Sequence, residues 1–193
     1  TLQLLFMSNN SLSRLPAATF VNSQTKVTTM LNTVYLDGNH LKEIPRDIQY
    51  ATSLKELGLN KNSISNVPRE IRALKKLFAI DLRNNNITNL NLSNNTLLTS
   101  LGIYGNNLMS LDVRNNPDLV DLDCQNNNLK VLDVRNGNNI NFTYFNSLGN
   151  DSLYCIAADD SVWASSNWTN IPGHSFFSNF CSDYYFDIPN ELS

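Results

Sequence analysis

One short pattern recurs six times along the chain and constrains its fold more than any other feature. The pattern reads L-x-x-L-x-L-x-x-N-x-L, in which L stands for an apolar residue and x varies. Self-similarity at a nearly constant spacing indicates a stack of supersecondary units, because no single unit could bury its apolar side alone. The asparagines of the six copies are Asn10, Asn39, Asn62, Asn85, Asn106 and Asn127.

Within each copy, the segment x-L-x-L predicts a short strand with its apolar side chains on one face. Successive strands are expected to pair in parallel, so that their inward side chains form one continuous core. The asparagine follows the strand, where the chain turns away and leaves backbone groups between two copies. An asparagine amide supplies both a donor and an acceptor for such groups. We therefore predict a structural role for the six asparagines.

This pattern is the signature of leucine-rich repeats, and the chain resembles that family over residues 2–153. The resemblance implies an α/β solenoid, a horseshoe whose concave face is a parallel β-sheet. Its outer limb is expected to change along the chain. Ile44-Pro45 and Val67-Pro68 in the 23-residue copies predict short helices or 3₁₀ turns, because proline suits the start of such elements.

The 21-residue copies of the second half carry an alternating L-x-L or L-x-V segment instead, which predicts short outer strands. We expect these strands at residues 90–92, 111–113 and 132–134. The side chains of Asp112, Arg114, Asp133 and Arg135 would then form a solvated ladder of charges on the outer face, worth about 0–1 kcal/mol per pair.

The sequence divides into an array at residues 1–153, a C-terminal cap at 154–183 and a tail or linker at 184–193. The array opens in mid-pattern, so we expect its N-terminal cap to be missing, and the long first spacing predicts an outer bulge within residues 18–32. The coil at residues 140–153 begins at either Ile140 or Phe142. The cap aromatics are expected to cover the end of the core; they are Trp163, Trp168, Phe176, Phe177 and Phe180.

The three cysteines fall into two classes. Cys124 occupies an apolar position of its strand, so we predict a buried free thiol. Cys155 and Cys181 lie beyond the repeats and remain as the natural pair. A disulfide between them would stabilise the fold by roughly 3–4 kcal/mol and implies an oxidising compartment.

The second half has a closer resemblance. Its 21-residue copies and the cap segments at residues 153–160 and 177–181 are similar to those of secreted leucine-rich repeat proteins of Bacteroidota, of the flavobacterial type. This resemblance implies paired cap cysteines and a secreted or cell-surface location. The chain departs from that group in its 23-residue copies and in lacking a sorting module.

The composition and the scarcity of histidine argue against several function classes. The net charge is −3 and only 16% of the residues are charged, so there is no basic footprint for nucleic acid. No apolar run approaches the ~20 residues of a membrane span. His40 and His174 have no spacing to a nucleophile, and no zinc-binding spacing occurs. Asp159-Asp160 lacks the alternating ligands of a calcium loop. We expect no enzyme, no cofactor and a monomer.

Function is expected on the concave face, where the variable strand positions point into the hollow of the solenoid. Aromatic side chains there suit interface hot spots, and the excess of carboxylates favours a basic or polar partner. Asp121 and Asp123 are paired acids, but no pocket-forming residue is evident beside them. The hypotheses are a recognition module for a protein or glycan, and a structural spacer or adhesin segment that binds elsewhere. The candidate residues are Phe6, Tyr35, Asp37, Glu56, Asn60, Asp81, Arg83, Tyr104, Asp121 and Asp123.

Overall fold

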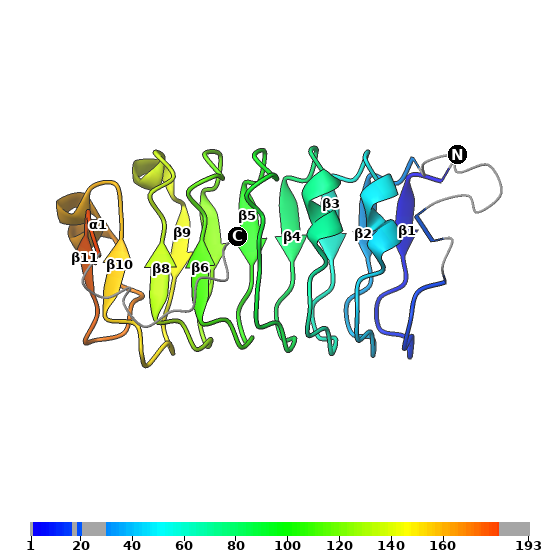
Figure 1. Cartoon of the computed structure of the whole chain (residues 1–193), viewed down its shortest axis with the longest axis horizontal. Helices are drawn as coiled ribbons and strands as arrows, with labels where there is room; N and C mark the ends of the chain where they lie inside the picture. Colours follow the sequence, from blue (N-terminus) through cyan, green and yellow to red (C-terminus); the bar gives the residue numbers. More distant parts are fainter. Residues whose placement is uncertain (1, 17–18, 21–29, 182–193) are drawn as a thin grey trace.

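The structure, a computed structural model, describes residues 2–16, 19–20 and 30–181 and is an elongated solenoid (Figure 1). The predicted tail at 184–193 and most of the predicted bulge at 18–32 lie outside these residues. Within them, seven short strands form one parallel inner sheet in which each coil pairs with the next. These strands are β1 (Leu4–Phe6), β2 (Thr33–Tyr35), β3 (Glu56–Gly58), β4 (Ala79–Asp81), β5 (Ser100–Gly102), β7 (Asp121–Asp123) and β9 (Tyr144–Asn146).

The first half of the outer limb carries the predicted 3₁₀ helices. η1 (Arg46–Tyr50) and η2 (Arg69–Ala73) each begin directly after a proline, whose φ of −65° at Pro45 and −68° at Pro68 suits an element start. Ile48 and Ile71 anchor these helices in the core. The two proline segments therefore form the elements that their sequence indicates.

The second half of the outer limb carries strands, with one correction. β6 (Ser110–Asp112) and β8 (Val131–Asp133) pair in parallel, each one residue earlier than predicted. The strand predicted at residues 90–92 is wrong, since that segment forms none. The preceding coil carries η2 at this place, and a helix offers no strand edge for pairing. Leu92 is nevertheless buried, as the apolar pattern requires.

The outer sheet continues into the cap, which the sequence did not reveal. Its order is β11-β10-β8-β6, where β10 is Cys155–Ala157 and β11 is Phe176–Ser178. Two short helices accompany it, η3 (Asn139–Asn141) and α1 (Ser161–Asn167). The cap thus extends the stack of coils and is not a separate lid.

The core contains the apolar residues of the repeated pattern. Cys124 is fully buried as a free thiol, as predicted, and Cys155 and Cys181 form the predicted disulfide with their Cα atoms 5.9 Å apart. The first coil differs, because β1 is the end strand of the sheet and has a neighbour on one side only. Leu2 and Met7, at apolar positions of the pattern, are consequently exposed.

Aromatic rings fill the cap end of the core. Phe145 stacks on Trp168 with ring centroids 4.3 Å apart, and Phe177 packs against both. The prediction that all five cap aromatics cover the core is wrong for Phe176 and Phe180, which are 44% and 77% exposed. Alternation along β11 explains the first, because Phe177 points inward and its neighbour must point outward.

The register of the last coil is settled by strand pairing. Phe145 lies beside Leu122 in the sheet, so the coil begins at Phe142 and not at Ile140, which is 65% exposed. Asn150 then occupies the position of the repeated asparagine. Its side chain makes the same contacts as those of the earlier coils.

The repeated asparagines bridge neighbouring coils through their side-chain amides. Asn85 Nδ2 donates to the carbonyls of Leu59 at 2.9 Å and Leu82 at 3.0 Å, and Asn85 Oδ1 accepts from the Ile64 N–H at 2.9 Å. The asparagines of the other coils, from Asn39 at one end to Asn150 at the other, make the same three hydrogen bonds. One amide therefore satisfies buried backbone groups of two coils at once.

A second asparagine ladder runs along the outer side of the core. Asn95 and Asn116 are fully buried, and Asn116 Nδ2 donates to the carbonyls of Leu92 and Asn95 at 3.1 and 2.9 Å. Asn136 continues the ladder by donating to the Asn116 carbonyl. The spacing of Asn95 and Asn116, which is one 21-residue repeat, is the sequence signal for this second ladder.

The residue before each repeated asparagine adopts a left-handed backbone conformation. Lys61, with φ of 54°, stands where the other coils carry glycine or asparagine. This conformation costs roughly 1–2 kcal/mol for an ordinary side chain and little for glycine. The residues in this row are Asn9, Gly38, Lys61, Asn84, Gly105, Asn126 and Gly149.

Asn85→Ala is expected to lower the free energy of unfolding by about 1–3 kcal/mol, because three buried backbone groups lose their partner. The matched control is Asn86→Ala, whose side chain is exposed and which should change stability by less than about 0.5 kcal/mol. Denaturant unfolding of both variants measures the difference. Equal effects would show that the bridging amide contributes nothing specific.

Lys61→Gly is expected to stabilise the protein by ~0.5–1 kcal/mol, because it relieves the left-handed backbone strain. Lys76→Gly is the control, since Lys76 is exposed in a turn without positive φ. There the substitution should destabilise by up to about 1 kcal/mol through the entropy of the unfolded chain. Thermal unfolding reports both signs, and a destabilised Lys61→Gly variant would contradict the first expectation.

Candidate binding hollow on the inner sheet

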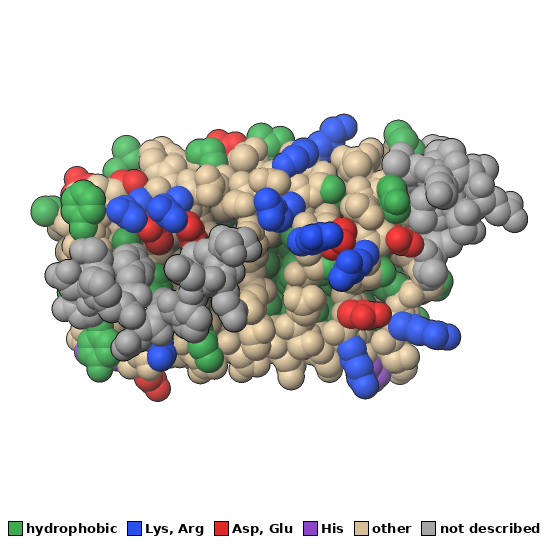
Figure 2. Space-filling view, viewed as in Figure 1, with side chains coloured by type: hydrophobic (Ala, Val, Ile, Leu, Met, Phe, Trp, Pro, Cys, Tyr) green, Lys and Arg blue, Asp and Glu red, His purple; other side chains and the backbone are tan. Residues whose placement is uncertain are grey.

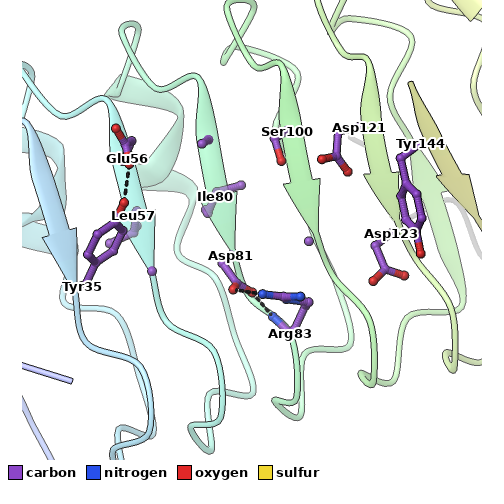
Figure 3. A pocket seen from close by; sticks show the side chains of 13 residues that line it. Tyr35, Glu56, Leu57, Ile80, Asp81, Arg83, Ser100, Asp121, Asp123 and Tyr144 are labelled. Atoms are coloured by element: carbon purple, nitrogen blue, oxygen red, sulfur yellow. Dashed lines mark hydrogen bonds and ion pairs between the residues drawn. The ribbon is translucent and has the colours of Figure 1, made fainter. Parts of the chain in front are cut away.

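The outward side chains of the inner sheet surround a hollow of about 510 Å³, called here the inner hollow (Figure 3). Side chains alternate along a strand, so the first and third residues of each strand reach the same face. The hollow spans β2 to β9. Its lining residues are Tyr35, Glu56, Leu57, Gly58, Ala79, Ile80, Asp81, Arg83, Ser100, Gly102, Asp121, Asp123 and Tyr144.

Small residues form the floor of the inner hollow. A Cβ atom at Gly58 would lie 2.7 Å from Tyr35 Cδ1 and 2.8 Å from Asp37 Oδ2, so only glycine permits those side chains to lie over β3. A Cβ atom at Gly102 would lie 3.2 Å from Arg83 Cγ and Cδ. Between them, Ala79 adds only a methyl group. The two glycines therefore let the side chains of Tyr35, Asp37 and Arg83 lie close against the sheet.

Hydrogen bonds within the protein satisfy the polar groups at the β2–β3 end. The Tyr35 hydroxyl donates to Glu56, and this bond, together with burial, raises the pKa of Tyr35. Asp37 accepts from the Asn60 N–H at 2.8 Å. The Phe6 ring stacks on Tyr35 with centroids 5.3 Å apart, which extends the aromatic surface beyond the hollow.

A bidentate ion pair occupies the middle of the inner hollow. Arg83 Nε donates to Asp81 Oδ1 at 2.9 Å, and Arg83 Nη2 donates to Asp81 Oδ2 at 2.6 Å (Figure 3). The hydrogen bond to Asp81 raises the pKa of Arg83. Asp81 is therefore already neutralised by its own neighbour.

The β7–β9 end is different, because its carboxylates form no salt bridge and feel the charge of Arg83 only from a longer distance. No salt bridge within the described residues involves Asp121 or Asp123. Asp123 accepts from the Gln125 N–H at 3.5 Å. Burial raises the pKa of Asp123 and outweighs the lowering effect of hydrogen bonds from Gln125 and of the Arg83 charge. Tyr144 stands beside Asp121 on the next strand, and its hydroxyl accepts from Asn146 at 3.1 Å.

The candidate residues from the sequence divide into two groups. Six of them line the inner hollow, namely Tyr35, Glu56, Asp81, Arg83, Asp121 and Asp123. Phe6, Asp37, Asn60 and Tyr104 do not line it, although Asp37 and Phe6 contact residues that do.

Tyr144 was missed at the sequence level. The register of the last coil was left open there, so the position of Tyr144 on the inner face was not recognised. The spacing from Phe142 to Phe145 was the available signal. The expectation that Asp121 and Asp123 have no pocket-forming neighbour is wrong, because Tyr144 supplies one.

Other chemistry finds little basis in the described part of the chain. His40 and His174 are both exposed. Asp160 caps α1 by accepting from the Val162 and Trp163 N–H groups, and Asp159 accepts from the Gly137 N–H. Over the described ranges, no group of three or more His, Cys, Asp or Glu side chains is arranged to hold a metal ion. No helix in those ranges is long and apolar enough to cross a membrane.

On the outer face, acidic and basic side chains are paired. Arg114 contacts both Asp112 and Asp133, at 2.8 and 3.4 Å, and Arg135 contacts Asp133 at 2.6 Å. Asp133 is buried, so this ladder is less solvated than predicted. Burial alone would raise the pKa of Asp112, but the hydrogen bonds from Arg114 outweigh it and lower that pKa. Figure 2 shows charges of both signs interspersed.

Comparison with known proteins supports the solenoid fold that the structure shows. The family model described as "Leucine rich repeat" matches residues 29–87. No curated protein sequence matches the chain. Together with the parallel sheets, these observations define the fold as a leucine-rich repeat solenoid.

Three solved structures illustrate the likeness. The functional domain of InlJ from Listeria monocytogenes has a TM-score of 0.62 at 20% identity over 81% of this chain. The ectodomain of the receptor kinase GASSHO1/SCHENGEN3 from Arabidopsis thaliana, in complex with CASPARIAN STRIP INTEGRITY FACTOR 2, has 0.70 at 24% over 91%. The plant peptide hormone receptor RGFR1, in complex with RGF2, has 0.56 at 21% over 67%. The match spans 40%, 21% and 24% of those chains.

Two aspartates are expected to affect stability with opposite signs. The pKa of Asp123 is raised above its ordinary value of 3.8. Its favourable contribution to folding stability is therefore present below pH 3.8 and is lost as the pH rises. The pKa of Asp112 is lowered below 3.8, so its favourable contribution to folding stability is present above pH 3.8 and is lost as the pH falls. At pH 7, Asp123→Asn should therefore stabilise and Asp112→Asn should destabilise.

Denaturant unfolding at pH 7 and pH 3 tests this pair. Both differences from the unsubstituted protein should be smaller at pH 3 than at pH 7, because carboxylates lose charge as the pH falls below 3.8. A loss of stability in Asp123→Asn at pH 7 would contradict the expectation that this carboxylate is poorly solvated.

Proposed function

We propose that this chain is a non-catalytic extracellular recognition module that binds a protein partner through the inner hollow. The observation that carries the proposal is the combination of a small-residue floor with tyrosines at both ends and unneutralised carboxylates between them. A hollow of about 510 Å³ lies within the usual range of ligand sites. Tyrosines are among the residues enriched at interface hot spots.

The fold and the comparisons support a protein partner over other ligands. Curved parallel sheets in solenoids present extended concave surfaces to partners. Two of the similar structures, the plant receptors, are described in complex with their ligands. The strands that hold the inner hollow are paired along the whole sheet, so the surface is formed before any partner arrives.

The chemistry of the cysteines supports an extracellular location. A disulfide between Cys155 and Cys181 persists in oxidising compartments, which supports secretion or exposure at a cell surface. The resemblance of the 21-residue copies to secreted proteins of Bacteroidota points the same way. We propose a monomer that acts outside the cytoplasm.

A blocked hollow tests the function. Random peptides displayed on phage are selected on the unsubstituted protein, and the binders are measured on Gly102→Trp, whose indole fills the floor beside Arg83. Affinity should fall at least about tenfold, which corresponds to ~1.4 kcal/mol. Thr88→Trp, at an exposed position outside the hollow, is the control and should bind as before.

Thermal unfolding of both tryptophan variants establishes that they fold. Peptides that bind the two variants equally would favour the alternative, a spacer or adhesin segment whose binding site lies elsewhere. A parallel glycan array on the same proteins separates a glycan from a protein ligand, because only the true ligand class should be sensitive to Gly102→Trp.

A further inference from the structure

We infer that the partner presents an arginine or lysine side chain to the β7–β9 end of the inner hollow, where Asp121 and Asp123 hold it beside the Tyr144 ring. The inference rests on the proposed function and specifies the chemistry of the partner segment. It follows from which charges in the hollow are paired within the protein and which are not.

Pairing within the protein leaves a charge imbalance at one end only. Four carboxylates and one guanidinium line the inner hollow. Asp81 holds the guanidinium of Arg83 through two hydrogen bonds, and Glu56 accepts from the Tyr35 hydroxyl. Asp121 and Asp123 form no salt bridge among the described residues, and Arg83, which is bound to Asp81, acts on Asp123 only from a longer distance.

The two aspartates are placed to act on one cation. They are the first and third residues of β7, so they lie on the same face with Cα atoms about 7 Å apart. A guanidinium has five N–H donors spread over a plane and can reach two carboxylates at once. A lysine ammonium group can bind one carboxylate and lie near the other.

The surroundings of the two aspartates favour a long side chain. Ser100 lies opposite Asp121 on β5, and its small side chain leaves space for an aliphatic stem. Tyr144 lies beside Asp121 on β9 and is 41% exposed, so its ring face is available for a cation–π contact. In Figure 3, Tyr144 and the two carboxylates surround one end of the hollow.

Burial strengthens the preference for a cation. Asp123 is partly withdrawn from water, which raises its pKa and leaves its charge poorly solvated. A bound guanidinium would compensate that charge at short range. An acidic segment would meet four carboxylates against one guanidinium and would be repelled.

The peptides selected on the unsubstituted protein provide the test. Those that lose affinity on Gly102→Trp should share a basic residue. One such peptide is synthesised with arginine and with citrulline, its neutral isostere, at that position. Asp121→Asn combined with Asp123→Asn should weaken the arginine peptide by at least about tenfold and leave the citrulline peptide almost unchanged.

Asp118→Asn is the matched control, because Asp118 is an exposed acidic residue outside the inner hollow. It should not discriminate between the two peptides. Glu56→Gln is a second variant, and a selective loss there would place the cation at the wrong end and overturn the inference.

Two further outcomes separate the inference from the function. Hollow-dependent peptides that lack a basic residue, or equal losses for the arginine and citrulline peptides, would overturn the inference while the hollow remained a binding site. An absence of hollow-dependent peptides would overturn the proposed function and the inference with it.

Discussion

The structure depends on one requirement, that backbone groups buried between two coils must find hydrogen-bond partners. A solenoid creates such groups at every turn, because each coil lies between two others and water cannot enter. The side chain of Asn85 meets the requirement by joining the carbonyls of Leu59 and Leu82 with the N–H of Ile64. Because these atoms belong to different coils, the same bonds that satisfy the turn also align successive strands.

That alignment creates the inner hollow. When neighbouring coils are held in one register, the first and third residues of every strand fall into straight rows across the sheet. Gly58 and Gly102 then give room to the side chains of neighbouring strands, while Tyr35 and Tyr144 lie at the two ends of the hollow. A slip of one residue would turn the apolar side chains outward and remove both core and hollow. Binding geometry and folding therefore share the same hydrogen bonds.

The sequence was informative wherever a residue's environment repeats from coil to coil. The pattern of apolar residues predicted the inner sheet, and it assigned Cys124 to the core. It was less informative where the environment changes. Residues 90–92 have the alternation of a strand but adjoin a coil that carries η2, and Tyr144 follows a break in the spacing. Pairing depends on the neighbouring coil, which a local pattern does not contain.

Charged side chains at equivalent places also differ in what they can do for a partner. On the outer face, each aspartate of β6 and β8 is followed two residues later by an arginine that reaches back to it. On the inner face, the same spacing gives Arg83 to Asp81, whereas the residue two positions after Asp123 is the neutral Gln125.

The residue two positions after the aspartate therefore decides whether a coil pairs its own carboxylate with an arginine. Net charge and composition do not reveal this difference, because it depends on the residue at one position of one repeat. The coil that contains β7 lacks the internal counter-ion and also faces Tyr144 across the sheet. A cation from outside would supply at that coil what Arg83 supplies at the coil of Asp81.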